Sequence, residues 1–167
     1  MKPLWAPWRM DYILNKEGQP EQSDDCVFCV GPVSDTDAER LVLERGKHAF
    51  VIMNRFPYNN GHLLVAPYRH VADLVDLTPE ENLELFELIC LSRVILQETM
   101  SPQGLNIGLN LGAAAGAGIA DHLHWHLVPR WQGDTNFMPV LAETRVIPQH
   151  LAVTYNLLAT AFSGRLK

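Results

Sequence analysis

Three histidines alternate with apolar residues within one short stretch of the chain. His122, His124 and His126 occupy every second position. Successive side chains of a strand point to opposite faces, so this period of two predicts a strand over residues 121–130 with the three imidazoles on one face. Same-face neighbours in a strand are roughly 6.5–7 Å apart, close enough to engage one phosphate group together. The alternative is an edge strand whose solvent face happens to carry histidine.

The chemistry that such a face could perform is phosphoryl or nucleotidyl transfer. A neutral imidazole is a good nucleophile near pH 7, and its attack on phosphorus gives a phospho-histidine intermediate that a second acceptor resolves. Neighbouring imidazoles can donate hydrogen bonds to the phosphoryl oxygens. The small residues of Gly112–Gly118 directly precede this stretch and would let backbone N–H groups approach a phosphate. His62 becomes a fourth imidazole if its strand pairs nearby, and is otherwise a surface loop histidine.

A cysteine pair, Cys26 and Cys29, lies near the N-terminus. Such a pair can be a redox motif, half of a metal site, or chance. A redox motif calls for a long helix after it, whereas Gly31-Pro32 breaks the chain here, which favours metal. A tetrahedral zinc site needs two more ligands, for which His70 and His122 are candidates. The sequence contains no His-Glu-x-x-His, Walker or Gly-x-Ser-x-Gly motif that would indicate another chemistry.

The composition indicates one globular domain over residues 1–167, beginning with an aromatic-rich arm at 1–25. Its net charge of −6 gives no sign of a nucleic-acid-binding surface. No apolar stretch approaches the roughly 18 residues of a membrane span, and no signal-peptide core is present, so we expect no membrane partner and a cytoplasmic location.

The elements that would position these residues follow from the hydrophobic pattern. A capping box at Thr78-Pro79-Glu80-Glu81 predicts a long helix to about Met100, in which Cys90 is expected to be buried. A shorter helix is predicted at 149–162. Strands are predicted at 40–45, 48–54, 62–67, 105–111 and 121–130, and weaker ones at 137–141 and 144–147. Strands joined by short turns, with one long helix, indicate an α+β fold with an antiparallel sheet.

The chain resembles the histidine triad (HIT) superfamily of nucleotide hydrolases and transferases. The stretch His122–Val128 fits the family's His-x-His-x-His followed by two apolar residues, and residues 49–65 resemble its nucleotide-binding hairpin. Trp5–Met10, Phe56-Pro57-Tyr58, Pro67-Tyr68-Arg69 and Pro129–Phe137 resemble bacterial members assigned as diadenosine-tetraphosphate phosphorylases. The resemblance implies a HIT-like fold with about five antiparallel strands, one long helix and a C-terminal helix. It also implies cleavage of dinucleoside polyphosphates at the α-phosphate, by phosphorolysis or hydrolysis, through a nucleotidyl-histidine.

The resemblance further implies roles for individual residues. His124 matches the nucleophile, and His126 and His62 match histidines that contact phosphate. The matching metal ligands of a structural zinc are Cys26, Cys29, His70 and His122. The residues implied in nucleotide binding are Asn54 at the ribose, Asn110 and Gly118 near the phosphates, and Phe28, Ile52 and Met53 around the base. The family is usually a homodimer whose two sheets join into one.

This chain departs from the family's pattern just before the triad. Gly118-Ile119-Ala120 stands where Gln-Ser/Thr-Val is usual, and the loop from Asn110 to His122 is one residue longer. The loss of a hydroxyl or amide there could open the site to inorganic phosphate or water. Two alternatives therefore stay open, an adenosine phosphoramidase and a nucleotide-binding regulator without turnover. His126 in place of glutamine disfavours hexose-phosphate uridylyl transfer.

Overall fold

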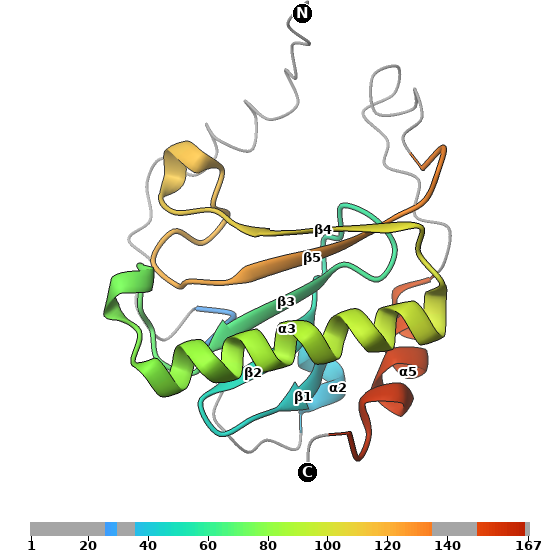
Figure 1. Cartoon of the computed structure of the whole chain (residues 1–167), viewed down its shortest axis with the longest axis horizontal. Helices are drawn as coiled ribbons and strands as arrows, with labels where there is room; N and C mark the ends of the chain where they lie inside the picture. The colour runs from blue at the N-terminus through green and yellow to red at the C-terminus, as the bar shows by residue number, and fades with distance from the viewer. Residues whose placement is uncertain (1–25, 30–35, 135–149, 166–167) are drawn as a thin grey trace, which may run out of the picture.

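A five-stranded antiparallel sheet forms the centre of the protein (Figure 1). The computed structural model describes residues 26–29, 36–134 and 150–165. The strands lie in the order β1-β2-β3-β5-β4, with the bounds β1 Val42–Arg45, β2 Ala49–Met53, β3 Leu63–Pro67, β4 Gly104–Leu109 and β5 Trp125–Arg130. Every neighbouring pair is antiparallel, which confirms the predicted α+β class and sheet type.

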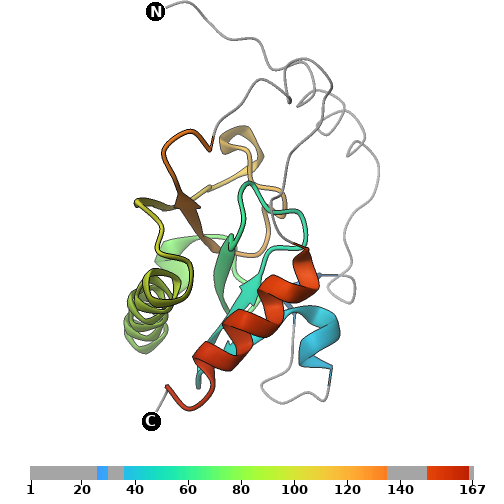
Figure 2. The same ribbon diagram turned by 90° about the vertical axis from the view of Figure 1, so that its right-hand side faces the viewer.

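The long helix α3 spans Pro79–Met100 and lies across one face of the sheet (Figure 1). Its capping box forms as predicted, because Thr78 Oγ1 accepts from the Glu81 amide at 3.2 Å and the Glu81 carboxylate accepts from the Thr78 amide at 2.8 Å. The C-terminal helix α5, Leu151–Phe162, contacts α3 and β1, and Figure 2 shows it beside β1. Three short elements were not predicted: α2 Asp37–Arg40, η2 Leu74–Asp76 and η3 Ala113–Ala115.

The strand register divides the side chains between the two faces of the sheet. Ile52 pairs with Leu64, and Leu64 pairs with His126, so these three share one face. The next row along the strands, which joins Met53 to Leu63 and Leu127 to Ile107, belongs to the other face. Ile107 lines a hollow together with residues of α3 there. The histidine face is therefore the one that α3 leaves uncovered.

The predicted histidine strand is shorter than expected. β5 begins only at Trp125, so His122 and His124 lie in the segment before it. Pairing with β3 stops at Val65, and two residues further along β3 stands Pro67, which has no N–H for a ladder bond. The Leu123 amide instead donates to the Val71 carbonyl at 2.7 Å.

The prediction that Cys90 is buried is wrong, because its position on α3 faces away from the core and the thiol is exposed. The predicted arm at 1–25 and the weak strands at 137–141 and 144–147 lie outside the described residues. In the part of the chain that the structure describes, no helix is both long and apolar enough to cross a bilayer. The single domain over residues 1–167 and the cytoplasmic location stay predictions.

Candidate functional site

The tight turn before β3 carries His62 into the sheet, where it is fully buried. Gly61 has a φ of +72°, and a Cβ there would lie 2.5 Å from the sulfur of Met100, so both backbone conformation and space favour glycine. Because β3 pairs with β5, Nε2 of His62 lies 3.0 Å from Nδ1 of His126. The structure thus brings His62 into the histidine group, and a surface loop position for it is excluded.

The hydrogen bonds of His62 determine which nitrogens carry protons. Its Nδ1 accepts from the Tyr58 backbone N–H at 3.1 Å and from the Asn54 amide nitrogen at 3.2 Å. The Asn54 oxygen accepts from the Phe56 amide at 2.9 Å, which orients the amide group. Neutral His62 therefore carries its proton on Nε2 and donates to Nδ1 of His126. His126 must then hold its own proton on Nε2, an atom that is buried without a hydrogen-bond partner among the described residues.

His124 has the opposite arrangement. Its Nδ1 donates to the backbone carbonyl of His122 at 2.8 Å, which leaves a lone pair on Nε2. Burial lowers the pKa of His124 from its ordinary value. Burial, followed by the charge of His124, lowers the pKa of His126 to about 4. Both rings are therefore neutral near pH 7. One imidazole offers a nucleophilic lone pair, and its neighbour, 4.9 Å away between ring centroids, offers an N–H donor.

The four predicted metal ligands come together beside this pair. The ligand atoms of Cys26, Cys29, His70 and His122 all lie within 4.8 Å of one another. Nδ1 of His122 is 3.5 Å from the Cys26 sulfur, and Nδ1 of His70 is 3.2 Å from the Cys29 sulfur. Tetrahedral zinc with bonds of 2.0–2.3 Å requires ligand separations of about 3.3–3.8 Å. The sulfur–nitrogen distances of 3.2, 3.5 and 3.8 Å are close to this range, and the ligand atoms that lie up to 4.8 Å apart would have to draw closer around the ion. Nε2 of His122 donates to the Pro67 carbonyl at 2.9 Å, which directs its Nδ1 lone pair toward the sulfurs.

Phe28 connects the cysteine pair to His124. It lies between Cys26 and Cys29, is only 3% exposed, and packs its ring 4.6 Å from that of His124 at an interplanar angle of 30°. The same ring lies 5.4 Å from that of His122. Phe28 therefore covers the imidazole of His124, and its predicted contact with the base stays a prediction.

The remaining residues predicted to bind the nucleotide do not all lie on the histidine face of the sheet. Ile52 lies on the histidine face, whereas the strand register puts Met53, which is 2% exposed, on the opposite face under α3. Asn110 donates to the Gly116 carbonyl at 3.4 Å and so holds the glycine-rich turn, in which Gly118 is half-buried. Sequence reasoning missed Tyr58, whose ring stacks on His62 at 4.9 Å. Its contribution is a backbone N–H, for which side-chain patterns give no signal.

The family model for the HIT domain matches residues 36–133, more than half of the chain. The chain therefore belongs to the histidine triad family. It is 41% identical over 167 residues to the AP-4-A phosphorylase of Mycobacterium tuberculosis, an alignment that covers 98% of this chain and 85% of that protein. It is also 36% identical over 93 residues to the asymmetrical bis(5'-nucleosyl)-tetraphosphatase of Schizosaccharomyces pombe, covering 56% of this chain and 50% of that one.

Solved structures agree with this assignment. A zinc-bound histidine triad family protein from Mycobacterium smegmatis superposes with a TM-score of 0.63 at 27% identity, covering 84% of this chain and 95% of that chain. A hypothetical histidine triad nucleotide-binding protein from Sulfolobus tokodaii gives the same TM-score of 0.63 and covers 82% of this chain and 91% of that chain. Because its sequence is only 21% identical, it supports the fold alone.

Proposed function

We propose that this protein is an enzyme that cleaves dinucleoside polyphosphates, such as diadenosine tetraphosphate, at an α-phosphate through a nucleotidyl-His124 intermediate. The observation that carries the proposal is the bond from His124 Nδ1 to the His122 carbonyl, which leaves the Nε2 lone pair beside the N–H of His126. The mycobacterial relative, an AP-4-A phosphorylase, and the fission yeast relative, a bis(5'-nucleosyl)-tetraphosphatase, support the substrate class.

In the first step, Nε2 of His124 attacks the α-phosphorus. A P–N bond forms while the bond from that phosphorus to its bridging oxygen breaks, and the rest of the polyphosphate chain leaves with the electron pair. Negative charge gathers on the non-bridging oxygens, where the N–H of His126 can donate a hydrogen bond. Because the donor is neutral and already oriented by His62, it needs no rearrangement as the charge develops.

In the second step, an acceptor oxygen attacks the same phosphorus and the P–N bond breaks, which returns the lone pair to His124. Inorganic phosphate as acceptor gives ADP from an adenylyl intermediate, and water gives AMP. We favour phosphate because the chain is 41% identical to a phosphorylase over nearly its full length.

The substrate groups are assigned to the residues that share the histidine face. We propose that Ile52 and the edge of Phe28 contact the base, that Asn54 contacts the ribose and that Asn110 and Gly118 lie near the phosphates. Met53 is assigned to the core under α3, because its register places it on the other face.

Incubation with diadenosine tetraphosphate, with and without phosphate, tests the proposal. ADP plus ATP formed only with phosphate means phosphorolysis, whereas AMP plus ATP means hydrolysis. His124→Ala should abolish either reaction and leave the urea midpoint of folding close to that of the parent. No turnover of any adenosine polyphosphate would refute the proposal, and cleavage of an adenosine phosphoramidate alone would favour the phosphoramidase alternative.

We also propose that Cys26, Cys29, His70 and His122 hold a structural zinc. The support is the tight grouping of two soft sulfurs and two imidazole nitrogens, together with the zinc-bound relative. Zinc would fix the segment around Phe28 to the end of β3. Metal analysis of Cys26→Ser should show loss of about one zinc per chain, while Cys90→Ser, which removes an exposed thiol outside the cluster, serves as the matched control. Equal zinc in Cys26→Ser and the parent would refute the site.

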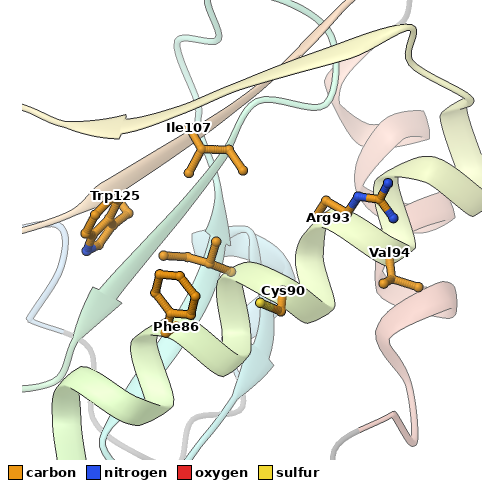
Figure 3. Close-up of a pocket in the computed structure, with 7 residues that line it drawn as sticks. Phe86, Cys90, Arg93, Val94, Ile107 and Trp125 are labelled. Atoms are coloured by element: carbon orange, nitrogen blue, oxygen red, sulfur yellow. The ribbon is translucent and has the colours of Figure 1, made fainter. Parts of the chain in front are cut away.

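We further propose a homodimer formed through β4 and α3. β4 is an edge strand, and beside it α3 exposes an apolar hollow lined by Phe86, Cys90, Val94, Ile107 and Trp125 (Figure 3). Phe86 is 62% exposed and Ile107 44%, so each element offers an apolar side chain to a partner at this hollow. Phe86→Asp should halve the mass measured by light scattering, whereas Val75→Asp, at an exposed apolar site away from this hollow, should not. An unchanged mass for Phe86→Asp would refute this interface.

A further inference from the structure

The Asp134 carboxylate lies outside the histidine group but is bonded to the turn that leads to His62. Its side chain is only 10% exposed. One oxygen accepts from the Asn59 amide at 2.9 Å, from Arg130 Nε at 2.6 Å and from the Trp131 amide at 3.0 Å, and the other accepts from the Arg130 guanidinium at 2.8 Å. The negative charge is thus paired with Arg130, which is itself held by the Asn106 side chain at 3.0 Å. Such a saturated carboxylate has a single low-energy orientation.

Asn59 connects this carboxylate to the turn. Its side-chain nitrogen donates both to Asp134 and, at 3.1 Å, to the Pro129 carbonyl at the end of β5. Its side-chain oxygen accepts from the Asn60 amide at 3.0 Å, and its backbone carbonyl accepts from the His62 amide at 3.2 Å. Every polar group of the Asn59 side chain is therefore used to hold the turn between β2 and β3 against the end of β5.

The peptide N–H immediately before Asn59 is that of Tyr58, the donor to Nδ1 of His62. A hydrogen bond weakens steeply once its donor turns away from the acceptor. The position of Asn59 consequently sets how well the Tyr58 N–H keeps the proton of His62 on Nε2. His62 in turn keeps Nδ1 of His126 as an acceptor and Nε2 of His126 as a donor.

We propose that Asn59 and Asp134 are positioning residues that fix the tautomers of His62 and His126 through the Tyr58 amide. The catalytic consequence rests on the proposed function, in which the N–H of His126 stabilises charge on the phosphoryl oxygens. When Asn59 and Asp134 no longer hold the turn, His62 can move its proton to Nδ1. It then accepts from Nδ1 of His126, which turns Nε2 of His126 into a lone pair facing the phosphate oxygens.

The test uses single and paired replacements in the full chain. Asp134→Asn keeps the shape of the side chain but turns an N–H toward one of the groups that now donate to Asp134. Asn59→Asp places a second carboxylate next to that of Asp134. Each should lower kcat about 10- to 100-fold, with KM changed much less. This is below the roughly 10²–10³-fold for complete loss of one transition-state donor, because the variants shift the tautomers only in part. The double variant Asn59→Asp/Asp134→Asn restores a donor–acceptor pair with its direction reversed and should recover about tenfold in kcat, as expected for contacting residues.

Asp37→Asn is the matched control. Asp37 accepts from Arg45 in a two-pronged ion pair of the same kind, at 3.0 Å to Nε, on a part of the fold that carries none of the four histidines. It should lose stability to urea without a change in kcat. A fall in kcat for Asp37→Asn equal to that for Asp134→Asn would mean that the effect is general destabilisation, and would overturn the proposal.

The nitrogen-15 spectra of the imidazoles give a readout that needs no turnover. In the parent, His62 and His126 should both appear as Nε2–H tautomers, and in Asp134→Asn both should shift toward mixed tautomers while His124 stays Nδ1–H. Unchanged tautomers in Asp134→Asn and Asn59→Asp would overturn the proposal. This result is separable from failure of the proposed function, because an enzyme with no activity on adenosine polyphosphates would still report its tautomers.

Discussion

Replacement of Phe28 tests whether this ring covers the nucleophile, as its packing indicates, or only lines the base pocket. Phe28→Ala removes a side chain that is 3% exposed and lies 4.6 Å from the His124 ring. Large-to-small core replacements of phenylalanine cost about 3–5 kcal/mol of unfolding free energy. Phe28→Leu keeps an apolar side chain over His124 and loses mainly the contact between the rings. We expect it to lower the unfolding free energy by about 1 kcal/mol.

The two variants should differ in the pH dependence of kcat. Burial lowers the pKa of His124, so opening the site raises that pKa toward its ordinary value and leaves more of the nucleophile protonated at pH 6. Phe28→Ala should therefore lose more kcat at pH 6 than at pH 8, whereas Phe28→Leu should keep the shape of the parent's profile.

The assay combines pre-steady-state turnover of diadenosine tetraphosphate across pH 5.5–8.5 with urea unfolding and a zinc measurement on each variant, using about six pH values per profile. Phe162→Leu, at a fully buried site on α5, controls for general loss of core packing. A raised KM with kcat and its pH profile unchanged in Phe28→Ala would show that Phe28 serves the base alone, and the reasoning from its contact with His124 would be wrong.

Three further predictions concern the supporting structure. Hydrogen bonding to Arg69 lowers the pKa of Glu81 to about 2 in the folded protein. The stability that the Glu81 carboxylate contributes is therefore fully present above its pKa in the unfolded chain, and is lost as the pH falls through its pKa in the folded protein. Glu81→Gln should cost about 2 kcal/mol at pH 7, and urea unfolding should show the difference from the parent narrowing below pH 4.5. The pKa of His126 is lowered to about 4, so the unfolded chain binds a proton more readily than the folded one. The parent should lose stability as pH falls from 6.5 toward 4, and His126→Gln should make that loss smaller, whereas equal slopes would contradict it. Glu84 accepts from the backbone amides of Lys47, His48 and Ala49 in the β1–β2 turn. Glu84→Gln should cost about 1–2 kcal/mol and speed hydrogen exchange at those amides, while unchanged exchange would refute the role.

Local signals in the sequence were sufficient for most of the described fold. The capping box at Thr78 predicted the start of α3, because its two hydrogen bonds depend only on residues three apart. The apolar stretches in residues 48–54 and 62–67 predicted β2 and β3 to within one residue at each end. The start of β5 was missed because it depends on where a different strand stops pairing. The exposure of Cys90 was missed because the apolar stripe of α3 is wider than the surface that the sheet covers.

The candidate site was predictable as a set of residues but not as a set of contacts. The spacing of Cys26 and Cys29 suggested metal, and the structure adds that His70 and His122 lie within reach of their sulfurs. Nothing in the spacing indicated that the Phe28 ring would pack against His124. The link from Asp134 to Asn59 joins residues 75 positions apart, so it appears only when the sheet brings the end of β5 to the turn before β3.

The three triad histidines are chemically identical in the sequence, and the partner of one ring nitrogen distinguishes the proposed role of each. The Pro67 carbonyl accepts a hydrogen bond from Nε2 of His122, which directs the Nδ1 lone pair toward the cysteines. The His122 carbonyl accepts a hydrogen bond from Nδ1 of His124, which leaves the Nε2 lone pair for the proposed attack. His62 donates a hydrogen bond to Nδ1 of His126, which leaves Nε2 of His126 as a donor. In a neutral imidazole, a hydrogen bond that makes one nitrogen a donor leaves the other nitrogen as an acceptor, and the reverse also holds. The proposed differences among the triad residues thus follow from backbone carbonyls and a fourth histidine, so replacements that move these partners, as at Asn59 or Asp134, should change the chemistry without touching the triad.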